Sequence, residues 1–276
     1  MAHGHAQPNV PHSSGRTVIS IVICSRDDRR FAAVAATYAA RMGDERHEII
    51  RIPDARSLCE GYNRGLRAAR GDICVFSHDD IEILSDDLGA TIRRHLATFD
   101  VVGVAGTTRM AGMFWAASGI RHARGLVAHR DEDGYTIDFF GAPAEVNDGI
   151  EGLDGVFIAA RRDVAERIGF DEATFDGWHG YDTDFTFRCH LAGHRLAVCL
   201  AIRLVHFSRG SIDDAWHHYA ARFHGKHADR LATDPGEWIT VQRRVADRSQ
   251  ILAAYDMNAL RALTEAIHAQ LEAGGA

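Results

Sequence analysis

The alternation of strand-like and helix-like patterns between residues 18 and 105 constrains the fold of this chain more than any other feature. Four short apolar runs, the first rich in β-branched residues, are separated by longer segments whose apolar residues recur at intervals of three and four. We expect strands at 18–24, 48–52, 73–77 and 101–105, and helices up to Met42, over 56–70 and from a Ser85 cap to Phe99. Short connections of this kind join parallel strands through helices, so the pattern predicts an α/β fold with a parallel sheet covered on both faces.

Beyond residue 105 the pattern changes. Residues 106–152 are rich in glycine and charge, and the alternation over 135–139 predicts an antiparallel ribbon followed by a loop. Further elements are expected as strands at 155–160, 196–200 and 203–207 and as helices at 162–168 and 181–192. From residue 212 onward the chain is predicted to be helical and to close with one helix or a helix pair.

Polar clusters follow three of the predicted strands directly. They are Ser25-Arg26-Asp27, Pro53-Asp54 and His78-Asp79-Asp80. In an open α/β sheet the ligand binds beyond the carboxyl ends of the strands. The coincidence of the three clusters at those ends is the first indication of a binding site.

The cluster His78-Asp79-Asp80 combines two carboxylates with an imidazole at the end of a strand. Oxygen ligands with open positions for substrate phosphates suit Mg²⁺ or Mn²⁺. A solvated turn is the alternative, because aspartate is common in turns. The position at a strand end favours the metal.

A second candidate site is the segment 176–184, in which Asp182 and Asp184 fall in the first turn of a helix. Two residues that are two positions apart lie about 200° apart around a helix, so these carboxylates cannot both face one reacting atom. One could act as a base, while the other caps the helix or, in the case of Asp184, pairs with Arg188. An ordinary helix start remains the alternative, since acidic residues are favoured there.

The histidines near the end of the chain carry weaker signals. His206 ends a predicted strand, and a single strand histidine is more often structural than a ligand. The set His217, His218, His224 and His227 lacks the cysteine or carboxylate partners of a zinc site, and we expect it to be solvated surface.

Charge excludes one broad class of function. The formal net charge is −7, with 31 basic and 38 acidic residues, which argues against general nucleic-acid binding because that depends on neutralising phosphates. Lys226 is the one lysine, so the basic residues are nearly all arginine. Guanidinium groups can still bind phosphate or carboxylate at a local site.

The cysteines and the termini indicate a cytoplasmic protein. The five cysteines include no C-x-x-C pair, which predicts reduced thiols in a reducing compartment. No apolar run approaches the roughly 18 residues of a transmembrane helix. Residues 1–16 lack the apolar core of a secretory signal and are predicted to form a flexible tail.

Several segments, taken in order, resemble one family of enzymes. They are Ile19-Ser-Ile-Val-Ile-Cys-Ser25, Gly61-Tyr-Asn-Arg-Gly65, Gly71-Asp-Ile-Cys-Val-Phe-Ser-His-Asp-Asp80, Leu153-Asp-Gly-Val-Phe-Ile-Ala-Ala-Arg-Arg162, Gly169-Phe-Asp-Glu172, Gly180-Tyr-Asp-Thr-Asp-Phe185 and Val205-His206. In order and spacing the chain resembles the family 2 type of GT-A glycosyltransferases. It is similar to the bacterial glycosyltransferase-like branch with His-Asp-Asp in place of Asp-x-Asp.

This resemblance implies a Rossmann-like, mostly parallel GT-A sheet and a set of functional residues. The implied partners are a nucleotide-sugar donor, most readily a UDP-sugar, a glycan or glycolipid acceptor and a Mn²⁺ or Mg²⁺ ion. The implied contacts are Ser25, Arg26, Asp54, Asn63, His78 and Asp79 with the nucleotide, Asp80 and His206 with the metal, and Asp154, Gly155, Trp178 and His179 with the acceptor. Asp182 matches the position of the family's catalytic base, with an inverting outcome implied.

The chain departs from the family pattern at two positions. His78 stands where the family has aspartate, so its role in binding metal or ribose stays open. The usual Glu-Asp pair before the base helix is Tyr181-Asp182 here, which leaves the base to be either Asp182 or Asp184.

The resemblance over residues 17–210, together with the sequence patterns on either side of it, predicts how the chain is organised. The expected parts are a flexible tail at 1–16, a transferase domain at 17–210 with a nucleotide half at 17–105 and an acceptor half at 106–210, and a helical extension at 211–276. The expected partners include a second copy of the chain paired through the C-terminal helices and, separately, a membrane surface contacted peripherally, and no nucleic-acid partner is expected.

Two other functions compete with this prediction. A sugar-phosphate nucleotidylyltransferase would need a glycine-rich loop after the first strand, and residues 25–30 contain arginines but no glycine. A noncatalytic nucleotide-binding or partner-binding module is the other alternative, because the Glu-Asp pair is lost.

Overall fold

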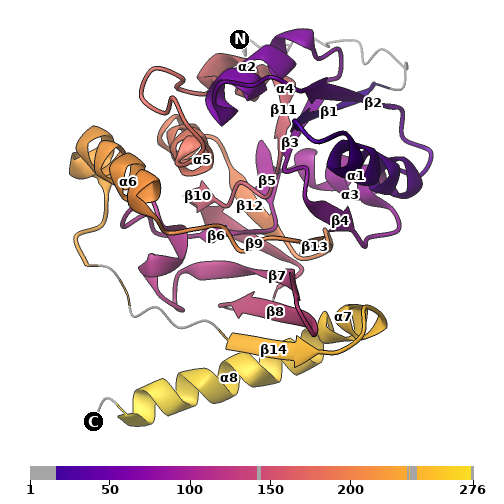
Figure 1. Ribbon diagram of the computed structural model, residues 1–276. Helices are drawn as coiled ribbons and strands as arrows, with labels where there is room; N and C mark the ends of the chain where they lie inside the picture. Colours follow the sequence, from indigo (N-terminus) through magenta and orange to yellow (C-terminus); the bar gives the residue numbers. More distant parts are fainter. Residues whose placement is uncertain (1–16, 142–143, 235, 237–240, 275–276) are drawn as a thin grey trace, which may run out of the picture.

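The structure is a computed structural model, which describes residues 17–141, 144–234, 236 and 241–274 (Figure 1). The tail predicted at residues 1–16 lies outside the described residues. Seven strands form a first sheet in the order β2-β1-β3-β11-β5-β12-β9. Their bounds are β1 (Ile19–Cys24), β2 (His47–Ile52), β3 (Ile73–Ser77), β5 (Val101–Gly103), β9 (Val146–Ile150), β11 (Phe157–Arg161) and β12 (Leu196–Cys199).

The first sheet is mostly parallel, as the resemblance implied, but two of its strands, β11 and β9, run antiparallel to their neighbours, which the pattern over residues 18–105 did not predict. β1 pairs in parallel with both β2 and β3, as predicted. β5 does not lie beside β3, because β11 inserts between them and runs antiparallel to both. β12 is parallel to β5, and β9 is antiparallel at the edge. The α/β class is confirmed, but the neighbour of β3 comes from a distant segment that local patterns do not indicate.

Helices cover this sheet in two groups (Figure 1). α2 contacts β1 and β2, α4 contacts β3 and β11, the two helices contact each other, and α5 contacts α4. α1 and α3 lie on the other side of the sheet. Their bounds are α1 (Asp28–Arg41), α2 (Leu58–Ala68), α3 (Leu88–Leu96), α4 (Arg162–Ile168) and α5 (Tyr181–Leu191).

The predicted cap of the third helix is wrong. α3 begins at Leu88, three residues after Ser85. The Ser85 hydroxyl instead accepts the backbone N–H of Arg203 at 2.7 Å and donates to the carbonyl of Ala201 at 2.9 Å. It therefore ties this loop to the segment that follows β12.

A second sheet packs beside the first, with the strand order β10-β6-β7-β13-β4 and with β8 paired to β7. Its strands are β4 (Ile81–Ile83), β6 (Ala105–Thr107), β7 (Ala123–Asp131), β8 (Gly134–Phe140), β10 (Gly152–Leu153) and β13 (Leu204–His206), and a short 3₁₀ helix, η1 (Trp115–Ser118), follows β6. The single strand predicted at 101–105 divides between β5 and β6, because the chain crosses there from one sheet to the other. The predicted antiparallel ribbon is confirmed by β7 and β8.

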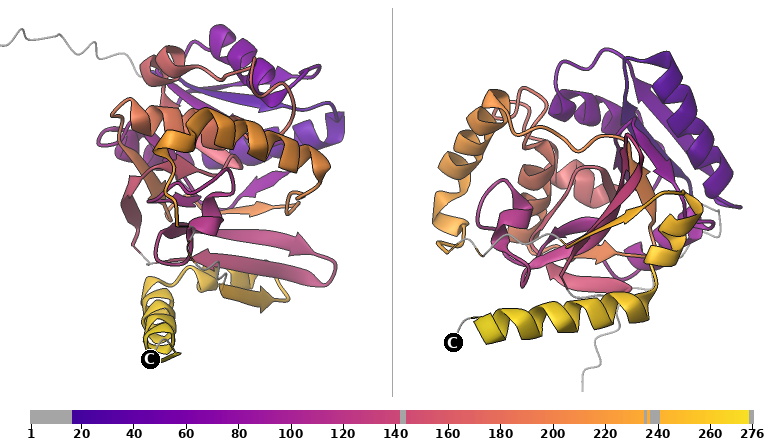
Figure 2. Two further views of the ribbon diagram at one scale, coloured as in Figure 1. Left: turned by 90° about the vertical axis from the view of Figure 1, so that its left-hand side faces the viewer. Right: turned by 60° about the horizontal axis from the view of Figure 1, so that its bottom comes forward.

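The C-terminal segment is not wholly helical, contrary to the prediction. Its helices are α6 (Asp214–His227), η2 (Ala228–Arg230), α7 (Ser249–Ala254) and α8 (Met257–Gly274). Between them, β14 (Val241–Val245) pairs antiparallel with β8 and extends the second sheet. Figure 2 shows β14 beside the β7–β8 hairpin. The two partly buried valines stand at the ends of this strand, and the three polar residues between them give no apolar–polar alternation that the sequence could reveal.

The sequence-based expectations on thiols and on membrane spans can be compared with the structure. All five cysteines are free and four of them are buried, which confirms the predicted unpaired thiols. Within the described ranges, no helix is both long and apolar enough to cross a membrane.

Candidate active site

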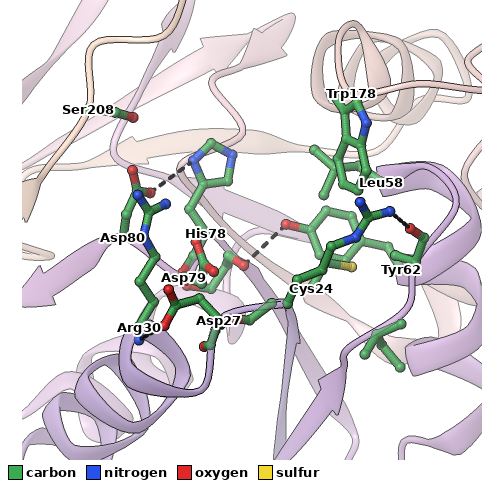
Figure 3. A pocket seen from close by; sticks show the side chains of 15 residues that line it. Cys24, Asp27, Arg30, Leu58, Tyr62, His78, Asp79, Asp80, Trp178 and Ser208 are labelled. Atoms are coloured by element: carbon green, nitrogen blue, oxygen red, sulfur yellow. Dashed lines mark hydrogen bonds and ion pairs between the residues drawn. The ribbon is translucent and has the colours of Figure 1, made fainter.

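A cavity of about 390 Å³ opens at the carboxyl ends of β1, β2 and β3, where the polar clusters were predicted to meet. Six of the predicted site residues line it, namely Ser25, Arg26, His78, Asp79, Asp80 and Trp178. Figure 3 shows Asp80 and Ser208 on one side of this first cavity and Trp178 on the other. A cavity is therefore present at the strand ends where the sequence predicted a binding site.

Arg26 and Trp178 form one wall of the first cavity. The Arg26 guanidinium lies 5.2 Å from the centre of the Trp178 ring and donates to the carbonyl of Ala55 at 2.8 Å. A cation over an aromatic face is attracted by the ring electrons. The Trp178 side chain remains 44% exposed, so a flat ring of a ligand has access to this wall.

His78, Asp80 and His206 form a cluster at the opposite side, which we call the trio. The Asp80 Oδ1 lies 3.3 Å from His206 Nε2 and 3.8 Å from His78 Nδ1, and the two imidazole nitrogens are 3.3 Å apart. Their candidate ligand atoms all lie within 4.8 Å of one another. The trio brings together β3 and β13, which are far apart in the sequence, and it adds His78 to the two predicted metal residues.

The chemistry of the trio fits a divalent metal ion. Burial and the nearby His206 lower the pKa of His78, which keeps its imidazole neutral with a lone pair free. Burial alone would raise the pKa of Asp80, but the hydrogen bond and the charge of His206, together with His78, hold it below the usual range. The Tyr181 hydroxyl contacts His78 Nε2 at 2.6 Å and so orients Nδ1 toward the trio. Two imidazoles and a carboxylate suit Mn²⁺, which accepts both nitrogen and oxygen ligands.

A second cavity of about 550 Å³ adjoins the first and shares Leu58, His78 and Trp178 with it. It is lined by the predicted residues Asp154, Gly155, Trp178, His179, Asp182 and His206. His179 lies 3.8 Å from Asp213 of the loop before α6. The predicted acceptor residues and one predicted base, Asp182, thus line the same cavity, which lies next to the trio and the first cavity.

Asp182 faces the second cavity from the first turn of α5. Burial and the charge of Asp154 raise its pKa to about 7, although backbone N–H groups of Thr183 and Gly155 oppose this. Asp154 is itself fixed, because it accepts from the Trp115 indole at 2.9 Å and from the N–H of Val156 at 2.9 Å. A carboxylate whose pKa lies near the working pH is suited to take up a proton.

Two glycines shape the approach to Asp182. A Cβ on Gly155 would lie 2.0 Å from the Tyr181 hydroxyl, so no side chain fits between β11 and α5. Gly180 precedes α5 with a φ of +77°, a conformation that other residues adopt only with strain. The glycines in the sequence pattern around the base helix therefore have a direct structural reason.

Asp184 lies on the opposite side of α5 and has no contact with the second cavity. It forms ion pairs with Arg188 at 2.7 Å, with Lys226 at 2.7 Å and with His227 at 2.8 Å. Burial would raise its pKa, but the His227 hydrogen bond and the charges of Arg188 and Lys226 outweigh burial and lower it. The sequence predicted the pair with Arg188 but not the partners from α6.

His227 corrects the prediction of a solvated histidine set. Its side chain is 5% exposed and bonded to Asp184, whereas His217, His218 and His224 are exposed as predicted. The i, i+3 spacing of His224 and His227 did not reveal this, because only the contact with α5 distinguishes the two.

Two predicted nucleotide-binding residues do not line the first cavity. Asp54 pairs with Arg64 at 2.6 Å and its side chain is 74% exposed. The Asn63 amide donates to the carbonyl of Phe170 at 2.8 Å and accepts its N–H at 2.9 Å, which locks α2 to the segment after α4. The structure therefore does not bring either side chain to the site.

Sequence reasoning missed several residues that line the second cavity. They include His129, Asp138, Arg209, Trp216 and Gln242, from β7, β8, the loop after β13, α6 and β14. His129 and Asp138 lie in the correctly predicted ribbon, so its period of two could have placed them on one face. Nothing in the local sequence indicates that Gln242 joins them.

The comparison with a solved mannosyltransferase agrees with this architecture. The mannosyltransferase PcManGT from Pyrobaculum calidifontis, solved with GDP-Man and Mn²⁺, superposes with a TM-score of 0.50 at 14% identity, covering 80% of this chain and 67% of that chain. GalNAc-T7, solved with UDP, GalNAc and Mn²⁺, gives a TM-score of 0.47 at 12% identity, covering 74% of this chain and 46% of that chain. The likeness to the mannosyltransferase shows a shared fold. No curated protein sequence gives a significant match.

The fold and site together define a glycosyltransferase of the GT-A type. A family model described as the glycosyltransferase-like family matches residues 20–230. The chain therefore belongs to the glycosyltransferase-like family, as the order of its motifs predicted. The match extends through α6, which supplies the partners of Asp184.

Proposed function

We propose that this chain transfers a sugar from a nucleoside diphosphate sugar to a hydroxyl group of a glycan or glycolipid. The observation that carries the proposal is that His78 and Trp178 line both cavities, so the trio and Asp182 face one continuous space. A donor in the first cavity and an acceptor in the second would meet at this junction. The mannosyltransferase from Pyrobaculum calidifontis is in complex with GDP-Man and Mn²⁺, and we propose ligands of the same two classes here.

The residues of the first cavity bind the donor in this proposal. Ser25, Arg26 and Asp79 contact the nucleoside, and Trp178 offers a ring face. His78, Asp80 and His206 hold Mn²⁺ or Mg²⁺, which would neutralise charge on the departing diphosphate. A UDP-sugar is the proposed donor, with a GDP-sugar as the alternative to be distinguished by experiment.

The residues of the second cavity act on the acceptor. Asp182 accepts the proton of the attacking hydroxyl, and Asp154 keeps the pKa of Asp182 high enough for this role. One base facing the donor from a separate wall suits a single inverting displacement. A glycosidase would instead need two carboxylates flanking the bond.

The proposal is tested with a panel of nucleotide-sugars and Mn²⁺, in the wild type and in Asp80→Ala. Thermal stability should rise by about 2.7 kcal/mol at a hundredfold excess of the right donor over its Kd. Asp80→Ala should lose this metal-dependent increase, because the trio loses its carboxylate. Asp86→Ala is the matched control, since the Asp86 side chain is 90% exposed and pairs only with Arg41 in the described part of the chain.

Three outcomes would contradict the proposal. Donor binding and turnover that persist in the presence of a chelator would show that the site does not use a metal ion. Binding without release of nucleoside diphosphate would favour the noncatalytic module. Release of pyrophosphate from a nucleoside triphosphate would favour the nucleotidylyltransferase.

A further inference from the structure

Asp138 is a carboxylate that the proposed reaction does not use, although it lines the second cavity. Its side chain is only 11% exposed. Gln242 donates to Asp138 Oδ1 at 3.0 Å, Arg209 donates to Oδ2 at 3.3 Å, and His129 Nε2 lies 3.6 Å from Oδ2. We call Asp138, Arg209 and Gln242 the distal cluster. Three separate chain segments thus hold one buried carboxylate in a single orientation.

The distal cluster depends on a strand outside the family-matched residues. The family match ends at residue 230, whereas Gln242 lies in β14, directly across from Asp138 of β8. Directly opposed residues on neighbouring strands have their side chains in contact range. The C-terminal segment therefore completes one wall of the second cavity.

The distal cluster also marks where the second cavity continues into a third. A cavity of about 680 Å³ lies over β8 and β14, and it shares Arg209 and Gln242 with the second cavity. Its further walls include Asp131, Tyr135 and Arg244. The second and third cavities therefore meet at the distal cluster, which gives a path from Asp182 to the outer edge of the second sheet.

Aromatic side chains line the same path near Asp182. They are Phe114, Trp115, Phe140 and Trp216. Trp115 packs edge-on against Phe140 at 4.9 Å, and Phe114 packs edge-on against Trp216 at 6.4 Å, so these rings support each other. Aromatic faces beside carboxylate, amide and guanidinium groups match the two surfaces of a sugar ring, its C–H face and its hydroxyl edge.

We propose that the acceptor is an oligosaccharide, and that the distal cluster binds a sugar beyond the one that receives the new bond. This inference rests on the proposed function, because it takes Asp182 as the base at the start of the path. Asp138 accepts hydrogen bonds from hydroxyl groups, since a carboxylate has about four acceptor positions. Arg209 and Gln242 hold Asp138 and contact the same sugar. In this proposal β14 determines the preference for a longer acceptor, because it supplies Gln242.

The test compares acceptors of different length in three proteins. A printed array of gluco-, galacto- and manno-oligosaccharides of one to four residues is probed with the wild type, Gln242→Ala and Arg243→Ala in the presence of UDP and Mn²⁺. Arg243 is the matched control, because neighbouring side chains of a strand point to opposite faces and Arg243 lines neither cavity. Melting curves of both variants verify that β14 stays folded.

The wild type should retain at least one oligosaccharide about tenfold more tightly than the matching monosaccharide, which corresponds to ~1.4 kcal/mol. Gln242→Ala should remove most of that tenfold advantage, and Arg243→Ala should keep it. Equal retention of monosaccharides and oligosaccharides by the wild type would overturn the inference, and so would unchanged retention in Gln242→Ala. Either result would mean that the distal cluster only joins β8 to β14 or serves a lipid-linked acceptor.

A parallel assay separates this inference from the proposed function. Release of nucleoside diphosphate from the nucleotide-sugar panel is measured without any acceptor, where water receives the sugar. Release together with no length preference supports the transferase and rejects the oligosaccharide subsite. Length-dependent retention with no release from any donor supports the subsite and rejects the transferase.

Discussion

The two sides of helix α5 hold carboxylates of the same type in opposite surroundings. On the side of the second cavity, burial and the charge of Asp154 raise the pKa of Asp182 to about 7. On the side packed against α6, burial is outweighed by His227, Arg188 and Lys226, and the pKa of Asp184 is lowered. The first carboxylate is easily protonated, and the second stays charged.

This difference shows how position on a helix separates reactivity from structure. Two residues two positions apart face opposite directions, so one helix start can serve both purposes. The charge of Asp184 is compensated by cations and joins α5 to α6. The charge of Asp182 has an aspartate as its neighbour and remains available for proton transfer.

Of the changes that distinguish the two sides of α5, Asp182→Asn should have the largest effect. An amide cannot accept the proton of the acceptor hydroxyl, so transfer should fall by about 10²- to 10⁴-fold, the usual contribution of a general base. Donor binding should be unchanged, because Asp182 does not line the first cavity. Steady-state release of nucleoside diphosphate and calorimetric donor titration measure the two effects, and normal turnover in the variant would reject Asp182 as the base.

The other side of α5 is tested by Asp184→Asn. This change leaves Arg188, Lys226 and His227 together without a buried carboxylate, and breaking a buried ion pair in this way costs roughly 3–5 kcal/mol. Urea unfolding should reveal that loss of stability, with turnover per folded molecule retained. Asp163→Asn is the control, because its ion pair with Arg161 is solvent-exposed and contributes at most about 1 kcal/mol. A fully stable Asp184→Asn protein without activity would instead make Asp184 the base.

The α5 region also shows how far sequence reasoning reaches. The helix start, the opposite directions of the two aspartates and the Asp184–Arg188 pair all depend on residues within a few positions of one another. The strand-end clusters after β1 and β3 were predicted on the same basis, because the carboxyl ends of parallel strands meet at one edge. Local periodicity was sufficient for these features.

The unpredicted features depend on contacts between distant segments. β11 inserts between β3 and β5, and β14 pairs with β8, although neither pairing has a local signal. Lys226 and His227 reach Asp184 only because α6 packs on α5. Asn63 has its whole amide engaged by Phe170, which a motif comparison cannot reveal. The choice between Asp182 and Asp184 as the base therefore depends on knowing the contacts on both sides of α5.

The smallest expected effect is the pH dependence that Asp182 imposes. Transfer needs the ionised carboxylate, so activity should rise with pH through about 7 and then level off. Asp154→Asn should move this midpoint to lower pH, because it removes the neighbouring negative charge. A midpoint near the ordinary aspartate value of 3.8 would show that Asp182 is not perturbed.

The free energy of unfolding should also depend on the ionisation of Asp182, but it should fall as the pH rises, whereas the activity should increase. Because the folded pKa of Asp182 is raised, the folded state binds more protons than the unfolded state between pH 3.8 and about 7, and stability falls as pH rises through that window. Asp182→Asn removes this loss of stability. The variant should therefore have the same melting temperature as the wild type at pH 4 and a higher one at pH 8, by roughly 2–4 °C for each kcal/mol of stability regained. Asp184→Asn should be less stable than the wild type at pH 8, since its carboxylate is compensated. Equal melting temperatures of Asp182→Asn and the wild type at pH 8 would mean that the two sides of α5 do not differ electrostatically.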